Sequence, residues 1–100
     1  MVFVKVATLN DVPEGEGKVV VASGREIALF KKDGKFYAID NTCKHQGGPL
    51  GEGWLEDSIV NCPWHGWRYD IKTGKNEQFP NVKVDTFPVK VEGDDVLVDV

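Results

Sequence analysis

Two short segments contain all of the cysteine and histidine in this 100-residue sequence. The first reads Cys43-Lys44-His45 and the second reads Cys62-Pro63-Trp64-His65, with 16 residues between them. Each segment offers one thiolate and one imidazole, two ligand types that transition metals such as zinc and iron accept. A metal site shared by the two segments is therefore the first chemistry that the sequence suggests.

Three kinds of site use these residue types. A disulfide between Cys43 and Cys62, or two buried thiols, would leave both histidines without a role. One tetrahedral zinc ion on all four side chains is chemically allowed. Zinc fingers, however, usually place Cys with Cys and His with His, whereas each segment here has one of each. The third kind is an iron–sulfur cluster. Two ferric ions, two sulfides, two thiolates and two neutral imidazoles give such a cluster a net charge of zero. A neutral cluster accepts an electron more easily than one with four thiolates, so its reduction potential is about −150 to +300 mV, against about −400 mV for all-thiolate plant-type clusters.

The residues next to the four candidate ligands suit a metal site. We expect Gly47, Gly48 and Gly66 to let the backbone approach closely and to point N–H groups at sulfur. Pro49 fixes its own φ and should stiffen the first loop.

Three aromatic residues follow or lie within the second segment. Trp64 and Trp67 are candidates for shielding the site from water. Tyr69 carries a hydroxyl that we expect to donate to a ligand sulfur. Hydrogen bonds of this kind change the reduction potential of a cluster.

The elements that must position these residues are mostly strands. The loops, at about 41–53 and 61–70, are flanked by short β-type runs, and Asp33-Gly34 between two such runs is a strong hairpin signal. Alternation with period two, for example over Val82, Val84 and Thr86, predicts an all-β antiparallel sandwich or small barrel. One helical turn is expected near Asn10-Asp11-Val12-Pro13.

The bulk properties limit the remaining possibilities. A length of 100 residues predicts a single domain, 1–100. A net charge of −4 argues against nucleic acid as a partner, which would need clustered Lys and Arg. The N-terminus is not that of a secretory signal, and no stretch approaches the ~20 apolar residues of a membrane span. We therefore expect a cytoplasmic protein with no membrane contact.

The pattern C-x-H, 16 residues, C-x-x-H, with its glycine and proline positions, resembles the Rieske [2Fe–2S] domain. That resemblance implies one [2Fe–2S] cluster per chain. It also implies that Cys43 and Cys62 bind one iron and that His45 and His65 bind the other. The implied fold has three small antiparallel sheets, with the two cluster-binding loops forming a subdomain at one tip.

Departures from the motif of respiratory and photosynthetic members indicate the subtype. The two cysteines that form a disulfide between the loops in those proteins are Gly48 and Trp64 here. Their serine that donates to a sulfide is Trp67, whereas their tyrosine is retained as Tyr69. Fewer hydrogen bonds to sulfur predict a potential toward the low end of the Rieske range. The chain is closer to the soluble ferredoxins of bacterial aromatic-ring dioxygenase systems.

This resemblance implies a monomeric electron carrier that performs no catalysis of its own. Its expected partners are a flavin-dependent reductase and a terminal oxygenase or similar redox protein. It is not the oxygenase, because a mononuclear iron would need further histidines. Two alternatives stay open: a small Rieske subunit of a larger reductase, such as an assimilatory nitrite reductase, and a structural zinc-binding module.

Overall fold

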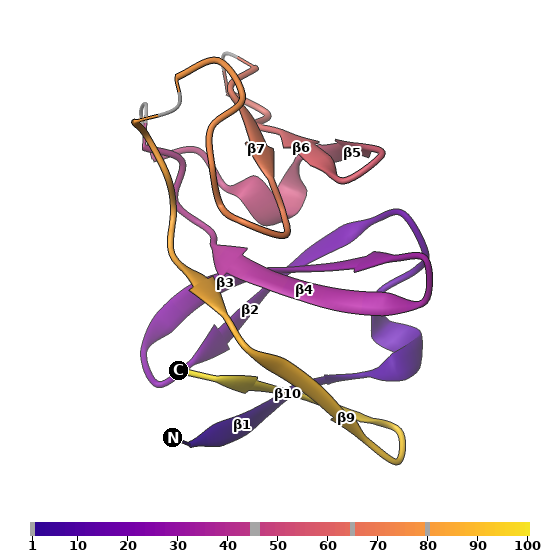
Figure 1. The fold of residues 1–100 in the computed structure, drawn as a ribbon. Helices are drawn as coiled ribbons and strands as arrows, with labels where there is room; N and C mark the ends of the chain where they lie inside the picture. Colours follow the sequence, from indigo (N-terminus) through magenta and orange to yellow (C-terminus); the bar gives the residue numbers. More distant parts are fainter. Residues whose placement is uncertain (1, 45–46, 65, 80) are drawn as a thin grey trace.

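The chain folds into three antiparallel sheets (Figure 1). The structure is a computed structural model that describes residues 2–44, 47–64, 66–79 and 81–100. Its elements are β1 Phe3–Thr8, η1 Leu9–Asp11, β2 Gly17–Ala22, β3 Arg25–Lys32, β4 Lys35–Asp40, η2 Leu50–Glu52, β5 Trp54–Glu56, β6 Ile59–Asn61, β7 Arg68–Asp70, β8 Thr86–Phe87, β9 Val89–Glu92 and β10 Asp95–Asp99. The predicted all-β class with three small sheets is confirmed. Within the described ranges, no helix is long and apolar enough to cross a membrane.

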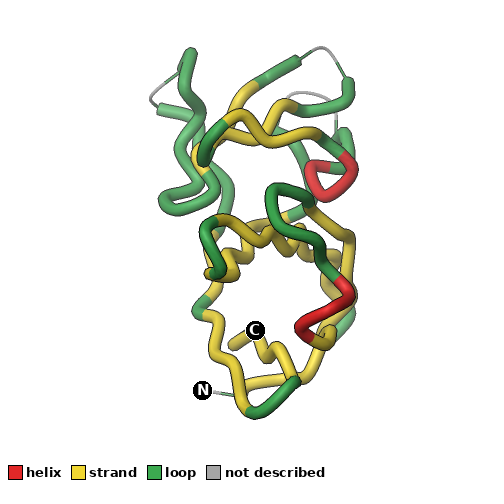
Figure 2. Tube along the Cα trace, turned by 90° about the vertical axis from the view of Figure 1, so that its right-hand side faces the viewer, coloured by secondary structure: helices red, strands yellow, loops and turns green. Residues whose placement is uncertain are grey.

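Two of the sheets form the base of the molecule. Their strand orders are β1-β10-β9 and β2-β3-β4-β8. Seen from the side in Figure 2, these strands form a ring, and the two ends of the chain lie close together because β1 pairs with β10. The interior of the ring is filled by small and branched apolar side chains: Ala7, Val12, Val20, Ala22, Ile27, Leu29, Ala38, Val96 and Val98.

Strand β3 contributes to two separate cores. Ile27 and Leu29 face the interior of the ring, whereas Ala28 and Phe30 face the third sheet on the other side. All four are 0% exposed. A short continuous apolar run is typical of a strand buried on both faces. This strand therefore joins the base to the sheet that positions the metal loops.

The predicted hairpin at Asp33-Gly34 is confirmed. It joins β3 to β4 through a two-residue loop, and the ladder pairs Lys32 with Lys35. Asp33 and Gly34 have φ values of 55° and 76°. Positive φ at both loop residues is the requirement of the type I′ turn, whose twist matches that of the flanking strands.

Glu14 holds this turn from outside, because its carboxylate accepts the Asp33 N–H at 2.7 Å and the Gly34 N–H at 2.9 Å. These bonds lower the pKa of Glu14 below its ordinary value of 4.5. A lowered folded-state pKa gives stability that is present above the unfolded-state pKa and is lost as pH falls through the folded value.

We therefore expect Glu14→Gln to lower the thermal midpoint at pH 7, and the difference from the parent to shrink as the pH falls below 4.5. The measurement is the unfolding midpoint of both proteins between pH 7 and pH 3. Glu16→Gln, at an exposed neighbouring position, is the charge-matched control. A difference that stays the same at every pH would contradict the role of this carboxylate.

Two details differ from the sequence predictions. The expected helical turn is present as η1, but η2 was not foreseen. The expected strand over Val82, Val84 and Thr86 is wrong for its first half, because the strand begins only at Thr86. Val84 is buried and its N–H donates to the Gly74 carbonyl, so the segment folds back on a turn instead of joining a ladder.

Candidate metal centre

The two predicted metal loops lie at one end of the molecule, around the sheet β5-β6-β7 (Figure 1). The first loop follows β4, and the second connects β6 to β7. Residues of both loops and of β6 and β7 pack into one core with Phe30 and Ile39 of the base. The metal loops therefore rest on the base sheet.

Within each of the two predicted loop regions, an equivalent backbone hydrogen bond closes a six-residue loop, 43–48 in the first and 62–67 in the second. The Cys43 N–H donates to the Gly48 carbonyl at 2.9 Å, and the Cys62 N–H donates to the Trp67 carbonyl at 2.7 Å. Each bond joins the first and sixth residues of a six-residue loop. Each loop thus begins with a cysteine and contains one of the predicted histidine ligands.

A glycine occupies the fifth position of both loops. Gly47 has φ 76° and Gly66 has φ 72°, in the left-handed region that side chains rarely adopt. The predicted need for glycine at these two positions therefore has a conformational cause. It lets each loop turn back to its own cysteine.

The thiols of Cys43 and Cys62 meet beneath the loops. Both are free, they are 2% and 1% exposed, and their side chains interact. Burial raises the pKa of the Cys62 thiol to about 11, although the Trp64 N–H donates to this sulfur and opposes that rise. Without a cation this thiol is protonated at neutral pH, and a bound metal would displace the proton. Two adjacent buried thiols, one from each loop, suit a shared metal.

Gly48 lies directly over this sulfur. A Cβ at Gly48 would lie 2.7 Å from Cys62 Sγ and 3.1 Å from Trp64 Cβ. Gly48 and Trp64 are thus opposite each other, as expected for the positions that a disulfide links in other proteins with this motif. With a tryptophan as the opposite residue in this chain, the absence of a side chain at Gly48 leaves room for Trp64 and for Cys62 Sγ.

Tyr69 lies under the first loop and is 0% exposed. Its hydroxyl lies 3.5 Å from Cys43 Sγ and accepts the Lys44 N–H at 3.1 Å. Burial raises the pKa of this phenol to about 12, so it keeps its proton at neutral pH. The hydroxyl is therefore placed to donate to sulfur.

The two tryptophans of the second loop differ in burial. Trp67 is partly buried against the core, and its ring centroid lies 4.9 Å from that of Phe79. Trp64 is 50% exposed. The predicted shielding role suits Trp67, while Trp64 presents an aromatic surface to solvent.

Three residues near the loops were missed by the sequence reasoning. Asn41 Oδ1 accepts the Gly51 N–H at 2.7 Å and so ties the first loop to η2. Asn76 and Phe79 belong to a third segment that packs beside the second loop. No local pattern distinguishes these residues from ordinary turn and surface residues, because their roles depend on contacts distant in sequence.

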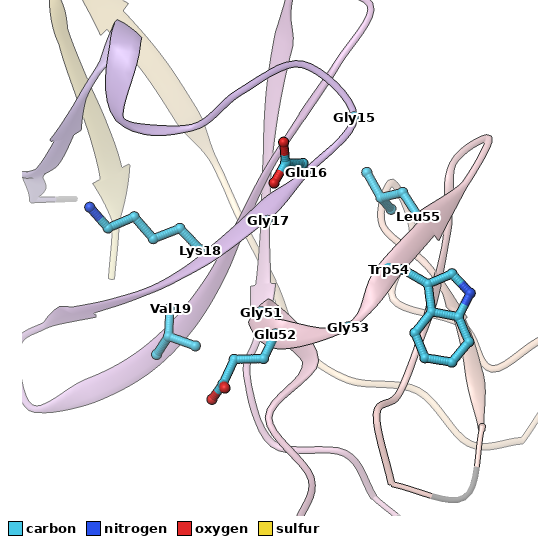
Figure 3. Close-up of a pocket in the computed structure, with 10 residues that line it drawn as sticks. All are labelled: Gly15, Glu16, Gly17, Lys18, Val19, Gly51, Glu52, Gly53, Trp54 and Leu55. Atoms are coloured by element: carbon cyan, nitrogen blue, oxygen red, sulfur yellow. The ribbon is translucent and has the colours of Figure 1, made fainter.

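A cleft of about 490 Å³ separates β2 from η2 and β5 (Figure 3). Glycine backbone forms much of its wall, at Gly15, Gly17, Gly51 and Gly53. The side chains of Lys18, Glu52 and Trp54 point away from one another in Figure 3. These three side chains therefore do not meet at one point in the cleft.

His45 and His65, the two other predicted ligands, lie outside the described residues. Comparison with known proteins nevertheless decides the family. The model of the Rieske [2Fe-2S] domain matches residues 2–88. The chain belongs to the Rieske [2Fe-2S] family.

Several proteins similar to this Rieske protein are ferredoxins. The ferredoxin component of the naphthalene 1,2-dioxygenase/salicylate 5-hydroxylase systems of Ralstonia sp is 39% identical over 97 residues, covering 96% of this chain and 93% of the relative. The ferredoxin of carbazole 1,9a-dioxygenase from Nocardioides aromaticivorans has a similar structure, with TM-score 0.89, 32% identity and coverage of 98% and 97%. A third similar structure is that of a complex of reduced oxygenase and oxidized ferredoxin in carbazole 1,9a-dioxygenase, with TM-score 0.87, 30% identity and coverage of 96% and 91%.

This chain is therefore a Rieske-type ferredoxin: a one-electron carrier and not a catalyst, with one [2Fe–2S] cluster. The described residues fit that cluster, since they supply two free buried thiols in contact and an N–H and a hydroxyl directed at sulfur. When bound, the cluster supplies a site that takes up and releases one electron. The polypeptide's part is to hold it, exclude water and set its potential.

Proposed function

We propose that Cys43 and Cys62 hold one iron of the cluster and that His45 and His65 hold the other. The observation that carries this assignment is the pair of identically closed loops, which brings two buried thiols into contact. The two histidines are the only ones in the sequence, and one falls within each loop. We further propose that the whole chain, 1–100, acts as one Rieske domain with cluster-binding loops at about 41–53 and 61–70.

The proposed partners are a flavin-dependent reductase, which supplies the electron, and a terminal oxygenase, which receives it. The complex of a similar ferredoxin with its oxygenase supports the second partner. Two large aromatic side chains near the loops are well exposed, Trp64 at 50% and Phe79 at 48%. Exposed aromatics beside a redox centre suit a transient docking surface.

The proposed carrier works as a monomer in the cytoplasm. The two cysteines of the sequence are both proposed ligands, so none is left for a structural disulfide, which is compatible with a reducing compartment. A small subunit bound permanently to a larger reductase is the competing arrangement. Gel filtration of the purified protein distinguishes these two arrangements, because only a bound subunit would elute together with a large catalytic chain.

The ligand assignment predicts distinct results for the two residue types. We expect the parent protein to contain two irons and two sulfides and, when reduced, to give a rhombic EPR spectrum with a low average g. Cys43→Ser or Cys62→Ser should lose the cluster. The double change His45→Cys with His65→Cys should move the potential toward the all-thiolate value of about −400 mV.

Lys44→Ala is the control, because Lys44 lies between two proposed ligands and its backbone contact with Tyr69 is kept. Its iron content and spectrum should be those of the parent. If the parent protein, made with ample iron, contained one zinc and gave no EPR signal, the assignment would be replaced by a structural zinc site.

A further inference from the structure

Asn76 is a buried polar residue beside Tyr69. It is 2% exposed, and it pairs with Tyr69 across an isolated antiparallel bridge. Residues paired in this way place their side chains on the same face. The amide of Asn76 therefore shares the buried space that contains the Tyr69 ring.

The orientation of this amide is fixed by the backbone. Asn76 Oδ1 accepts the Gln78 N–H at 2.8 Å and the Phe79 N–H at 2.9 Å. An oxygen that accepts two N–H donors cannot be exchanged with the NH₂ group without losing both bonds. The NH₂ group must therefore point away from the turn and into the protein.

That NH₂ group has no fully formed hydrogen bond to any residue that the structure describes, although it is buried. A buried donor without a partner is unfavourable, so its presence requires a reason. The acceptor that this amide faces is the Tyr69 hydroxyl, across the bridge between the two residues. The Lys44 N–H donates to the same oxygen.

A phenol oxygen has one proton to donate and two lone pairs that accept. The Lys44 N–H already uses one lone pair of Tyr69, at 3.1 Å. Because the Asn76 NH₂ group faces the other lone pair, the O–H has to point elsewhere. Cys43 Sγ, at 3.5 Å, is the neighbour that can accept it.

We propose that Asn76 is a positioning residue for electron transfer: it orients the Tyr69 hydroxyl toward the sulfur of Cys43 and so keeps the reduction potential high. The inference rests on the proposed role of Cys43 as an iron ligand. A hydrogen bond to a ligand sulfur favours the reduced state, in which the sulfur carries more negative charge. Asn76 reaches the cluster only through Tyr69.

A double-mutant cycle tests this chain of contacts. Asn76→Asp keeps an oxygen for the two turn N–H groups but removes the NH₂ donor. We expect the ratio of reduced to oxidised protein at a fixed applied potential to fall at least threefold, which is about 28 mV for one electron. Most of that shift should disappear when Asn76→Asp is combined with Tyr69→Phe.

Two further variants separate orientation from charge and from folding. Gln78→Glu adds the same charge two residues away, and its Oε1 can still accept the Arg68 N–H. Its shift should be the same with Tyr69 and with Phe at that position. Asn76→Ser is a neutral second variant that suits a turn. It should also lower the potential in the presence of Tyr69, and the thermal midpoint of each variant checks its folding.

The proposal is wrong if the Asn76→Asp and Asn76→Ser shifts are undiminished in the Tyr69→Phe background. It is also wrong if Tyr69→Phe alone leaves the potential unchanged. The iron content of Cys43→Ser distinguishes this failure from failure of the proposed ligand set. Loss of iron there with no coupling in the cycle removes only the role of Asn76, whereas full retention of iron removes the ligand assignment itself.

Discussion

Replacing Gly48 with alanine should strip the metal centre while leaving the base of the molecule folded. The new Cβ would lie 2.7 Å from Cys62 Sγ and 3.1 Å from both Cβ and Cγ of Trp64. The sulfur cannot easily move aside, because Cys62 is 1% exposed and its N–H is bonded to Trp67. The φ of Gly48 is not in the left-handed region, so the effect is one of contact and not of backbone strain.

The expected size follows from the cost of overpacking. Inserting a methyl group into a filled space costs about 1–3 kcal/mol. Applied to the binding of the cluster, that is a roughly 5- to 150-fold loss of affinity. Iron and sulfide per chain and the visible absorbance measure it directly. We expect the iron content and the sulfide content to fall to a small fraction of the parent values.

Ala22→Val is the control. It also adds bulk to a filled space, because Ala22 is 2% exposed, but it does so in the interior of the ring and not in the core that contains the two cysteines. It should lower stability yet keep two irons in the folded fraction. A Gly48→Ala protein with full iron and an unchanged spectrum would show that the two loops are not held together as the structure indicates.

The local features of the fold and of the metal centre could be predicted from the sequence because they depend on residues that are close together in the chain. Asp33-Gly34 predicted its hairpin, since a type I′ turn needs residues that tolerate positive φ. The two loops were recognisable because both cysteines and both histidines gather in them. Gly47 and Gly66 were expected to let the backbone approach the site closely, but their positive φ values show that the turn of each loop is what requires glycine.

The features that were missed depend on contacts between distant segments. The pairing of β1 with β10 joins the two ends of the chain, and no local pattern specifies it. Val82 and Val84 alternate like a strand, yet the backbone there bonds to the 74–76 turn. Asn76 resembles a turn residue, and its link to Tyr69 appears only when the turn is seen to pair with β7.

Phe30→Ala should cause a large loss of stability. Phe30 is 0% exposed and belongs to the core that also contains Cys43, Cys62 and Tyr69. Truncating a buried phenylalanine costs about 3–5 kcal/mol, out of a total of about 5–15 kcal/mol for a typical protein. For a chain of this size the thermal midpoint should fall by at least about 12 °C.

The measurement is a thermal scan by circular dichroism at one fixed scan rate, because loss of the cluster makes unfolding irreversible. Val21→Ala is the surface control, since Val21 is 64% exposed on β2 and such changes stay within about 0.5 kcal/mol. A midpoint for Phe30→Ala within a degree or two of the parent would mean that this core does not hold the two parts together.

Comparison of Phe30→Ala with Leu29→Ala tests how the base of the molecule supports the metal centre. Leu29 is the residue before Phe30 on β3, is equally buried and faces the other core. Its truncation costs about 2–5 kcal/mol, so both variants lose comparable stability. Only Phe30→Ala removes packing beneath the two cysteines. At a temperature well below either midpoint, the visible absorbance of its cluster should therefore decay faster than that of Leu29→Ala. Equal rates of absorbance decay would mean that the cluster is lost only when the whole protein unfolds. The packing of Phe30 against the metal loops would then have no separate effect on the cluster.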